Sequence, residues 1–301
     1  MRVFLTGGAG FIGSAVANRL RFREHHDLMV YDNCSTGKPE NVDATIALSI
    51  NDLNDYDQLE EAMYGFRPDV VVHLAAQPAI STSWQHYKHD AMVNVVGTIN
   101  VIRLCRELGV GRVIFSSTSA VYDDREGVLT EETRLFPNTP YGISKLAAER
   151  YVMTLMTENV VLRFGNVYGP RQVPLGENQV IPRMIRHFEQ GEAFFIHGDG
   201  DQRRDFVFVE DVALAVSKAL TGRSGIYNIS SGIPTSVNEL ARLMELIYEV
   251  PGYKWEHTKT PDLRRNANMR IQEAYKGLGW KPETLLLDGL KQTVEWWKQK
   301  K

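Results

Sequence analysis

The stretch RVFLTGGAGFIGS, residues 2–14, places three glycines between a short apolar run and the start of a helical pattern. Residues 2–6 are mostly apolar, which predicts a strand. Gly7, Gly10 and Gly13 follow, and a residue without a Cβ lets the backbone approach a phosphate closely. The N-terminus of the next helix would offer free N–H groups and a partial positive charge to a pyrophosphate. This order of strand, glycines and helix favours a dinucleotide site over a plain glycine turn.

An acidic residue at the end of the second predicted strand supports this site. Asp32 follows LMVY and lies 19 residues after Gly13, where a carboxylate can bind the hydroxyls of a ribose. Asn33 comes next and no arginine is adjacent, so a 2'-phosphate would meet a carboxylate instead of a cation. The sequence therefore predicts NAD as the cofactor in preference to NADP.

Short strand patterns alternate with helical patterns through the first half of the chain. Strands are predicted at residues 2–6, 28–32, 45–50, 70–75, 112–117 and 160–164, and helices at 11–23, 55–64, 90–109 and 140–157. Several of these strands are apolar without alternation, as a parallel strand covered on both faces requires. The pattern predicts an α/β fold with a doubly wound, Rossmann-like parallel sheet.

The alternation stops after residue 165, where glycine and proline interrupt the chain in NVYGPRQVPLGENQ. Residues 205–229 resume it, because FVFV and IYNIS are strand patterns. We therefore expect an NAD-binding domain of residues 1–165 plus 205–230. A smaller substrate domain would comprise residues 166–204 plus 231–301.

The composition excludes several classes of protein. The 301 residues are 43% hydrophobic, enough for one large or two ordinary domains, and the net charge of -3 gives no reason to expect nucleic acid or an anionic membrane as a partner. Neither a signal peptide nor an apolar run of about 18 residues is apparent, so we expect a cytoplasmic protein. Cys34 and Cys105 lack CxxC spacing, which indicates neither a disulfide framework nor a zinc site.

The segment YGISK, residues 141–145, places Tyr141 and Lys145 one turn apart on one face of a predicted helix. A nearby cation lowers the pKa of a phenol because it favours the phenolate. The spacing therefore predicts that Tyr141 acts as a base near neutral pH while Lys145 holds it in that form. On its own this Tyr–Lys spacing is common in proteins. It becomes a specific signal for catalysis here because it follows a dinucleotide loop and a predicted strand that ends in the hydroxyls of SSTS, residues 116–119.

A family resemblance rests on motifs that cover nearly the whole chain. They are TGGAGFIGS, DNCSTG, NDLND, HLAAQ, NVVGTIN, SSTSAVY, YGISK, RFGNVYGPRQ and GDGDQRRDFVFVEDVA. In this order they resemble the extended short-chain dehydrogenase/reductase family, and most closely its members that act on nucleotide sugars. The resemblance implies bound NAD as a recycled prosthetic group and a UDP-sugar as the substrate.

The resemblance also implies a set of cofactor contacts. In it Asp52 and Leu53 would contact the adenine, and Ala75 and Ala76 would line the path of the pyrophosphate. Asn94 would lie near the cofactor. The full set is Gly7, Gly10, Phe11, Ile12, Gly13, Asp32, Asn33, Ser35, Gly37, Asp52, Leu53, Leu74, Ala75, Ala76, Gln77, Asn94, Ser116, Tyr141 and Lys145.

A second set of residues would bind the sugar nucleotide. It comprises Thr118, Asn166, Gln179, Val180, His197, Arg204, Lys259, Asp262 and Asn266. Thr118 would be the hydroxyl partner of Tyr141, and Arg204 would bind the diphosphate through its planar guanidinium. Lys259 stands where relatives carry a second arginine, and Asn266 aligns with the residue that gates N-acetyl sugars. Gly165 replaces an aromatic residue.

The segment GDGDQRRDFVFVED also allows a calcium loop. Its acidic residues Asp199, Asp201, Asp205 and Glu210 fall at ligand positions 1, 3, 7 and 12 of such a loop. Position 6, however, holds Arg204 where the sharp turn needs glycine. We therefore expect no metal site.

The residues after Thr118 indicate the reaction. In the family's dehydratases and sugar-acid decarboxylases this strand continues into acidic residues, whereas here Ser119, Ala120 and Val121 follow. A site with hydroxyls but no extra acid can take one proton and one hydride and return them, but it has no obvious group for expelling water. We therefore expect an NAD-dependent enzyme that inverts C4 of a UDP-hexose, UDP-glucose or UDP-galactose, through a 4-keto intermediate.

Two alternatives remain. One is another nucleotide-sugar epimerase or a reductase, acting on a UDP-N-acetylhexosamine or a UDP-uronate. The other is a non-catalytic regulator that senses NAD, although such a protein need not keep the pair Tyr141 and Lys145.

The helical runs 90–109 and 140–157 carry more apolar residues than one face of a sheet obviously needs. They include Val93, Val96, Ile99, Tyr151, Leu155 and Met156. Similar enzymes pair two such helices across a two-fold axis, so we expect a homodimer. The alternative is that these residues only pack on the sheet.

Overall fold

The structure is a computed structural model that describes residues 1–123, 127–174, 179–259 and 267–300. Its largest layer is a sheet of seven strands in the order β11-β7-β5-β4-β1-β2-β3. The strands are β1 Arg2–Thr6, β2 Asp27–Tyr31, β3 Ala47–Ser49, β4 Val70–His73, β5 Arg112–Thr118, β7 Asn159–Phe164 and β11 Gly225–Ile229. All neighbours in this sheet are parallel. The expected Rossmann-like α/β fold is confirmed.

The central strands form because their β-branched and apolar side chains are buried on both faces. In β4 the side chains of Val70 and Val72 enter one hydrophobic cluster and that of Val71 enters another. This period of two separates the faces of a strand that is covered by helices on both sides. The strand order reverses between β1 and β4, which places a ligand crevice at the carboxyl ends of these two strands.

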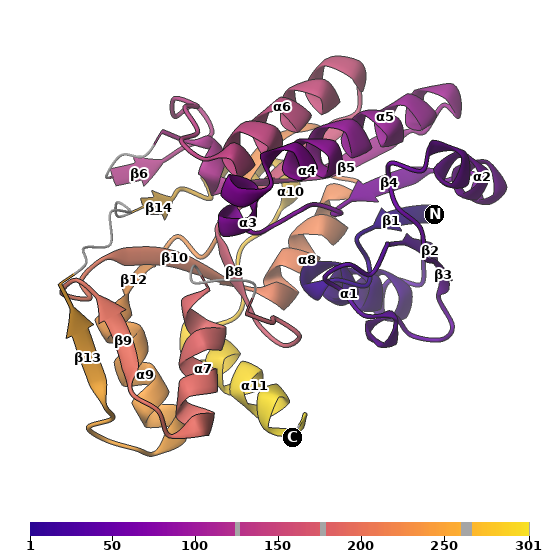
Figure 1. Ribbon diagram of the computed structural model, residues 1–301. Helices are drawn as coiled ribbons and strands as arrows, with labels where there is room; N and C mark the ends of the chain where they lie inside the picture. Colours follow the sequence, from indigo (N-terminus) through magenta and orange to yellow (C-terminus); the bar gives the residue numbers. More distant parts are fainter. Residues whose placement is uncertain (124–126, 175–178, 260–266, 301) are drawn as a thin grey trace.

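Helices cover both faces of the sheet (Figure 1). One face carries α2 Tyr56–Phe66, α5 Gly97–Glu107 and α6 Pro140–Leu155, and the other carries α1 Phe11–Asn18 with its continuation η1 Arg19–Arg23, and α8 Val209–Ala219. The helix expected at residues 90–109 is divided. It consists of the end of α4 Tyr87–Ala91, the π-helical η3 Met92–Val96 and then α5. A further short helix, α3 Ile80–Gln85, precedes α4.

The remaining elements lie mostly beyond the carboxyl edge of the sheet (Figure 1). A three-stranded sheet contains β12 Pro234–Ser236, β10 Arg203–Phe208 and β8 Asn166–Tyr168, and two pairs join β13 Trp255–Thr258 to β9 Phe194–His197 and β14 Ala267–Met269 to β6 Gly127–Leu129. The other helices are η2 Pro39–Asn41, η4 Ser119–Val121, α7 Val180–Gln190, α9 Val237–Tyr248, α10 Gln272–Leu278 and α11 Leu286–Lys298.

The two strands expected within residues 205–229 both form, but they join different sheets. The FVFV pattern overlaps β10, which pairs with β8 and β12, whereas β11 pairs with β7 at the edge of the large sheet. The division of the chain into two functional domains therefore stays a prediction. Within the described ranges, no helix combines the length and the apolar character needed to span a membrane.

Candidate active site

The glycine-rich loop lies at the crevice between β1 and β4. Gly7 has a φ of 73°, and a Cβ there would come within 2.6 Å of the Ala75 nitrogen. A Cβ at Gly13 would lie 1.9 Å from the carbonyl oxygen of Gly7, so both positions require glycine. At Gly10 a Cβ would meet no described atom closer than 3.3 Å, and no side chain caps the first N–H groups of α1. The loop therefore fits a pyrophosphate.

Asp32 lies beside this loop at the end of β2. Its Oδ2 accepts a hydrogen bond of 2.9 Å from the Ala9 nitrogen, and its Oδ1 accepts one of 2.8 Å from the Cys34 nitrogen. Gly37 packs against the same loop, because a Cβ there would lie 2.5 Å from the Ala9 carbonyl. These contacts fix the position of the carboxylate that we expect to bind the ribose hydroxyls.

The expected adenine contacts gather next to Asp32. Asn33 donates a hydrogen bond of 2.7 Å to the Asp52 carboxylate, and the Ser35 nitrogen donates one of 3.0 Å to the Asn33 side chain. Leu53 is buried, and its carbonyl accepts a hydrogen bond of 2.9 Å from Asn100. These hydrogen bonds fix Asn33, Asp52 and Leu53 at the end of the crevice where we expect the adenine of NAD.

The segment after β4 is fixed by side chains on both flanks. The Ala75 nitrogen donates to Oγ1 of Thr6 over 3.2 Å, and the Gln77 nitrogen donates to Oδ1 of Asn94 over 2.8 Å. The amide group of Asn94 also donates to Ser144 over 3.0 Å. Since both ends of this amide bind protein groups, Asn94 positions the backbone at Gln77. Leu74, Ala75 and Ala76 remain partly exposed at the crevice.

The three hydroxyls at the end of β5 have three different partners. Ser116 donates to the carbonyl of His73 over 3.2 Å, and Ser117 donates to Glu149 over 2.7 Å. Thr118 hydrogen-bonds the phenol of Tyr141, and its Oγ1 also accepts from the Ala120 nitrogen over 3.2 Å. The structure therefore brings Thr118 and Tyr141 together as expected.

Tyr141 and Lys145 lie in the first turns of α6. The helix begins well because Thr139 caps it, accepting a hydrogen bond of 3.0 Å from the Gly142 nitrogen, and Pro140 occupies the first helical position. Lys145 is 2% exposed, and its ammonium nitrogen lies 4.3 Å from the centre of the Phe115 ring. Such a contact favours the cation that burial disfavours.

Burial acts against the phenolate of Tyr141 when the site holds no cofactor. Burial raises the pKa of Tyr141 to about 12, although the hydrogen bond from Thr118 favours the phenolate. Burial also lowers the pKa of Lys145 to about 7, against the opposing charges of Glu149 and Asp90. Burial penalises both charged forms, and the sequence spacing does not encode this effect. The assignment of Tyr141 as the base therefore stays a prediction for the enzyme with bound NAD.

Beyond Tyr141 a cavity of about 280 Å³ opens among residues from both parts of the chain. It is lined by the expected substrate residues Thr118, Asn166, Gln179, Val180, His197 and Arg204. Lys259 is exposed and is absent from the described lining of the cavity. Asp262 and Asn266 lie outside the described residues.

Sequence reasoning missed several residues of this site. Arg183 of α7 lines the substrate cavity, with its guanidinium 5.3 Å from the Phe194 ring. Asp90 and Glu149 are buried near the pair Tyr141 and Lys145. No sequence signal marked them, because the docking of a helix decides which of its charged residues face inward.

Gly165, which replaces an aromatic residue of similar proteins, has a packing reason in the structure. It lines the cavity, but a Cβ at this position would lie 2.2 Å from Oγ of Ser230. The contact with Ser230 therefore requires the glycine.

Asp205, one of the four acidic residues of the calcium-loop alternative, already binds backbone groups of the protein. Asp205 accepts hydrogen bonds from the backbone nitrogens of Ser231, Gly232 and Met269 over 2.8 to 3.2 Å. Over the parts of the chain that the structure describes, no three His, Cys, Asp or Glu side chains are grouped to hold a metal ion.

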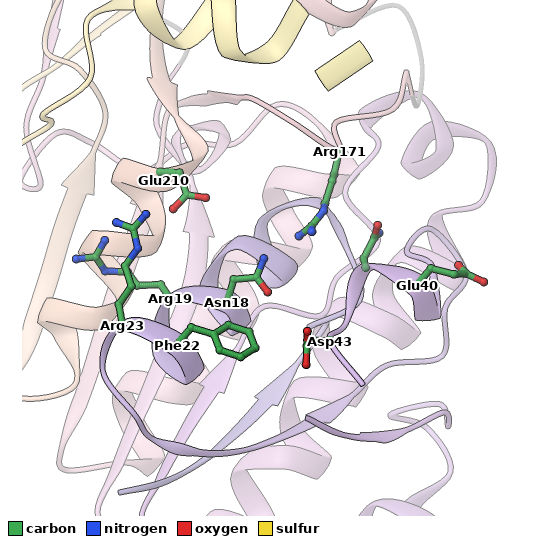
Figure 2. A pocket seen from close by; sticks show the side chains of 9 residues that line it. Asn18, Arg19, Phe22, Arg23, Glu40, Asp43, Arg171 and Glu210 are labelled. Carbon is green, nitrogen blue, oxygen red and sulfur yellow. The ribbon is translucent and has the colours of Figure 1, made fainter. Parts of the chain in front are cut away.

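A second cavity, of about 450 Å³, lies beside α1 and contains no expected site residue (Figure 2). It is lined by Asn18, Arg19, Phe22, Arg23, Glu40, Asn41, Asp43, Arg171 and Glu210. Its guanidinium and carboxylate groups are equal in number, so it presents no net charge that would select an anionic ligand.

The chain matches the NAD dependent epimerase/dehydratase family over residues 3–230. It belongs to that family. The extended short-chain dehydrogenase/reductase resemblance and NAD as the cofactor are thereby confirmed, and the glycine loop and Asp32 of this family member fit the cofactor.

Similar proteins include several UDP-glucose 4-epimerases. A putative UDP-glucose 4-epimerase of Methanocaldococcus jannaschii is 36% identical over 305 residues, which cover 98% of each chain. The UDP-glucose 4-epimerase of Thermotoga maritima, solved with UDP-glucose, has a TM-score of 0.94 and 33% identity over 100% of this chain and 99% of that one. The enzyme of Thermus thermophilus, solved with NAD, has a TM-score of 0.91 and 33% identity over 99% of each chain.

Other similar proteins are named for different reactions or substrates. Mouse dTDP-D-glucose 4,6-dehydratase is 33% identical over 321 residues, covering 99% of this chain and 89% of that protein. The UDP-N-acetylglucosamine 4-epimerase of Methanobrevibacter ruminantium, solved with UDP-N-acetylmuramic acid, has a TM-score of 0.92 and 28% identity over 100% of this chain and 99% of that one. Overall similarity therefore does not separate 4-epimerases from 4,6-dehydratases, and the residues of the active site must do so.

Proposed function

We propose that the protein is a 4-epimerase of UDP-hexoses, which interconverts UDP-glucose and UDP-galactose through a 4-keto intermediate. The observation that carries the proposal is the composition of the substrate cavity. Thr118 and Tyr141 supply hydroxyls to it, and its described lining contains no aspartate or glutamate. The family's dehydratases need acidic residues to eliminate water, whereas reversible removal of a proton and a hydride does not. The absence of carboxylates from this lining supports epimerisation.

The proposed steps assign a task to each polar group. Tyr141 removes the proton from the C4 hydroxyl, and Thr118 hydrogen-bonds the charge that develops on that oxygen. Bound NAD would accept the hydride from C4 and later give it back. Lys145 binds the ribose hydroxyls of the cofactor.

Arg204 holds the diphosphate while the 4-keto sugar turns over within the cavity. With the hydride that NAD would supply to the opposite face of C4, Tyr141 gives the proton back to the C4 oxygen. The cofactor is unchanged after one cycle, so no second reductant is needed.

The proposal is tested by the products that the purified protein forms. UDP-glucose, UDP-galactose, their N-acetyl forms and UDP-glucuronate are incubated separately, and the products are identified by NMR. Interconversion of UDP-glucose and UDP-galactose supports the proposal, whereas a 4-keto-6-deoxy product would identify a dehydratase. Retained NAD without turnover of any sugar would support the non-catalytic alternative.

UDP-N-acetylhexosamines are the second candidate substrates. The similar Methanobrevibacter ruminantium enzyme is named for such a sugar. Asn266, the expected gate, has an amide that can hydrogen-bond an N-acetyl carbonyl. Exclusive turnover of the N-acetyl forms would replace the hexose assignment and leave the reaction unchanged.

A further inference from the structure

The substrate cavity contains a second guanidinium that has no assigned role. Arg183 of α7 lines this cavity together with Arg204 of β10. These are the only arginine or lysine side chains of the described lining, which contains no aspartate or glutamate. The described lining therefore carries two cations and no carboxylate, unlike the cavity beside α1, where guanidinium and carboxylate groups are equal in number.

The first turn of α7 enters the cavity and brings Arg183 with it. Residues 179–182 line the same cavity. The Arg183 nitrogen donates a hydrogen bond of 3.4 Å to the Gln179 carbonyl, so these two residues lie one turn apart on one face of the helix. Arg183 is partly buried, whereas Arg186 on the same helix is exposed. The two arginines of α7 therefore have different surroundings, and Arg183 is the one that meets the cavity.

Phe194 of β9 fixes the guanidinium of Arg183. The guanidinium carbon lies 5.3 Å from the centre of the Phe194 ring, within the range of a cation–π contact. The ring is 1% exposed and makes T-shaped contacts with His187 and Trp255. A ring that is itself held in the core limits the movement of the guanidinium above it. Such preorganisation lowers the entropic cost of binding a ligand.

Two guanidiniums match the charge of a diphosphate. The diphosphate of a UDP-sugar carries two negative charges at neutral pH, and a planar guanidinium can bond two of its oxygens at once. Arg204 alone would leave one of these charges without a cation. Lys259, at the position where relatives carry a second arginine, is exposed and is absent from the described lining. Arg183 is the described residue of the cavity that can supply the second cation.

The chemistry of the sugar distinguishes a diphosphate contact from a contact with a sugar carboxylate. In the proposed reaction C4 lies at Tyr141, whose phenol hydrogen-bonds Thr118 of β5. The diphosphate is attached to C1, across the hexose ring from C4, whereas the carboxylate of a uronate is attached to C5, next to C4. The Arg183 guanidinium lies beside β9, which belongs to a different sheet from β5. This placement favours the diphosphate as its ligand.

We infer that Arg183 is a second phosphate-binding residue, which holds the diphosphate of the substrate together with Arg204. The inference deepens the proposed function, because it rests on a UDP-sugar as the substrate and names one of its contacts. It does not depend on which carbon of the sugar reacts. Since the diphosphate keeps its charge during the reaction, the contact should contribute to binding and not to the chemical step.

The binding of UDP and of uridine tests the inference without turnover. Both ligands are titrated by calorimetry into the protein with its NAD. In Arg183→Gln the affinity for UDP should fall about 10-fold, because a charge-assisted contact is lost. Arg183→Lys should recover part of this affinity, since an ammonium keeps the charge but lacks the planar fork. The affinity for uridine, which has no phosphate, should stay unchanged in both variants.

Two further variants provide the comparison. Arg186→Gln removes the same charge from an exposed position of the same helix and should bind UDP like the wild type. Lys259→Gln examines the rival cation. A larger loss of UDP affinity in Lys259→Gln than in Arg183→Gln would assign the second contact to Lys259 and overturn the inference.

Turnover separates this inference from the proposed function. If UDP-galactose is epimerised, Arg183→Gln should raise its KM about 10-fold with kcat nearly unchanged. If no epimerase activity is found, a loss of UDP affinity that spares uridine still supports the contact. Unchanged UDP affinity in Arg183→Gln would overturn the inference and leave the epimerase intact.

Two other results would also overturn it. Equal losses of affinity for UDP and uridine would show that Arg183 only maintains the shape of the cavity. A loss confined to UDP-glucuronate, titrated in the same way, would show that Arg183 binds a sugar carboxylate instead of the diphosphate.

Discussion

Oγ of Ser117 donates a hydrogen bond of 2.7 Å to the buried carboxylate of Glu149. The next residue along β5, Thr118, instead bonds the phenol of Tyr141 and lines the substrate cavity. Both partners belong to α6, Tyr141 in its first turn and Glu149 further along the helix, so two neighbouring hydroxyls of β5 can serve two purposes. One purpose here is structural, and the other belongs to the proposed chemistry.

Ser117→Ala and Thr118→Val should therefore have opposite effects. Removing the hydroxyl of Ser117 costs one hydrogen bond to a charged group, so the free energy of unfolding should fall by about 1–3 kcal/mol with turnover nearly retained. Thr118→Val should leave stability almost unchanged and lower turnover about 10-fold or more. Urea unfolding and turnover of UDP-galactose measure both, and similar effects of the two variants would contradict the distinction.

Tyr141→Phe should still bind NAD and the sugar nucleotide but lose most turnover. Only the proton transfer is removed, which is worth about 10²–10⁴ in rate. NAD is measured after release by denaturation, and UDP-sugar binding is measured by calorimetry. Near wild-type turnover would show that another group is the base, and recovery mostly of NADPH would contradict the assignment of Asp32.

The sequence predicted the elements that depend on a local pattern of residues. It did not predict which polar side chains are buried and what they contact, because tertiary packing decides that. The strands and the glycine loop follow from hydrophobic runs and from backbone geometry, which neighbouring residues specify. Lys145 and Glu149 are one helical turn apart and both are buried, and Glu149 binds Arg163 from another strand, which the spacing alone does not indicate. The expected helix at 90–109 contains the π-helical turn η3. Asn94 in this turn accepts a hydrogen bond from the Gln77 nitrogen, a contact that no local pattern encodes.

His73 should make the protein less stable as the pH falls. The hydroxyl of Thr98 donates its proton to the Asn94 carbonyl, so it must accept a hydrogen bond from Nε2 of His73. In the neutral ring Nδ1 then has no proton and accepts a hydrogen bond from Thr6. Burial lowers its pKa to about 3, so below the unfolded value of 6.5 the unfolded chain binds a proton that the folded protein refuses.

Stability from His73 is therefore present above pH 6.5 and is lost progressively between pH 6.5 and 3. His73→Gln should reduce the pH dependence of the unfolding free energy in this range, as measured by urea unfolding at several pH values. Parallel curves for the wild type and the variant would argue against the neutral histidine.

The expected homodimer should form through η3, α5 and α6. Val96 is 36% exposed and Tyr151 is 43% exposed on these elements, and Ile143 of α6 is 56% exposed. We expect a dimer mass in light scattering at micromolar concentration, and Tyr151→Glu should shift it to a monomer because a carboxylate would be buried at the interface. Tyr275→Glu is the control, since Tyr275 of α10 is also exposed but lies on another element. A monomeric wild type would refute the prediction.

Arg204→Lys should raise the KM for UDP-galactose about 10-fold while kcat changes little. Arg204 lines the cavity, and its planar guanidinium would bind the diphosphate, whose charge does not change during epimerisation. Binding that is equal in the ground state and the transition state affects KM and leaves kcat nearly constant. The neighbouring Arg203 provides the matched control, because it forms an ion pair of 2.8 Å with Glu239. Arg203→Lys should therefore leave KM unchanged, and equal increases of KM in both variants would contradict a phosphate contact at Arg204.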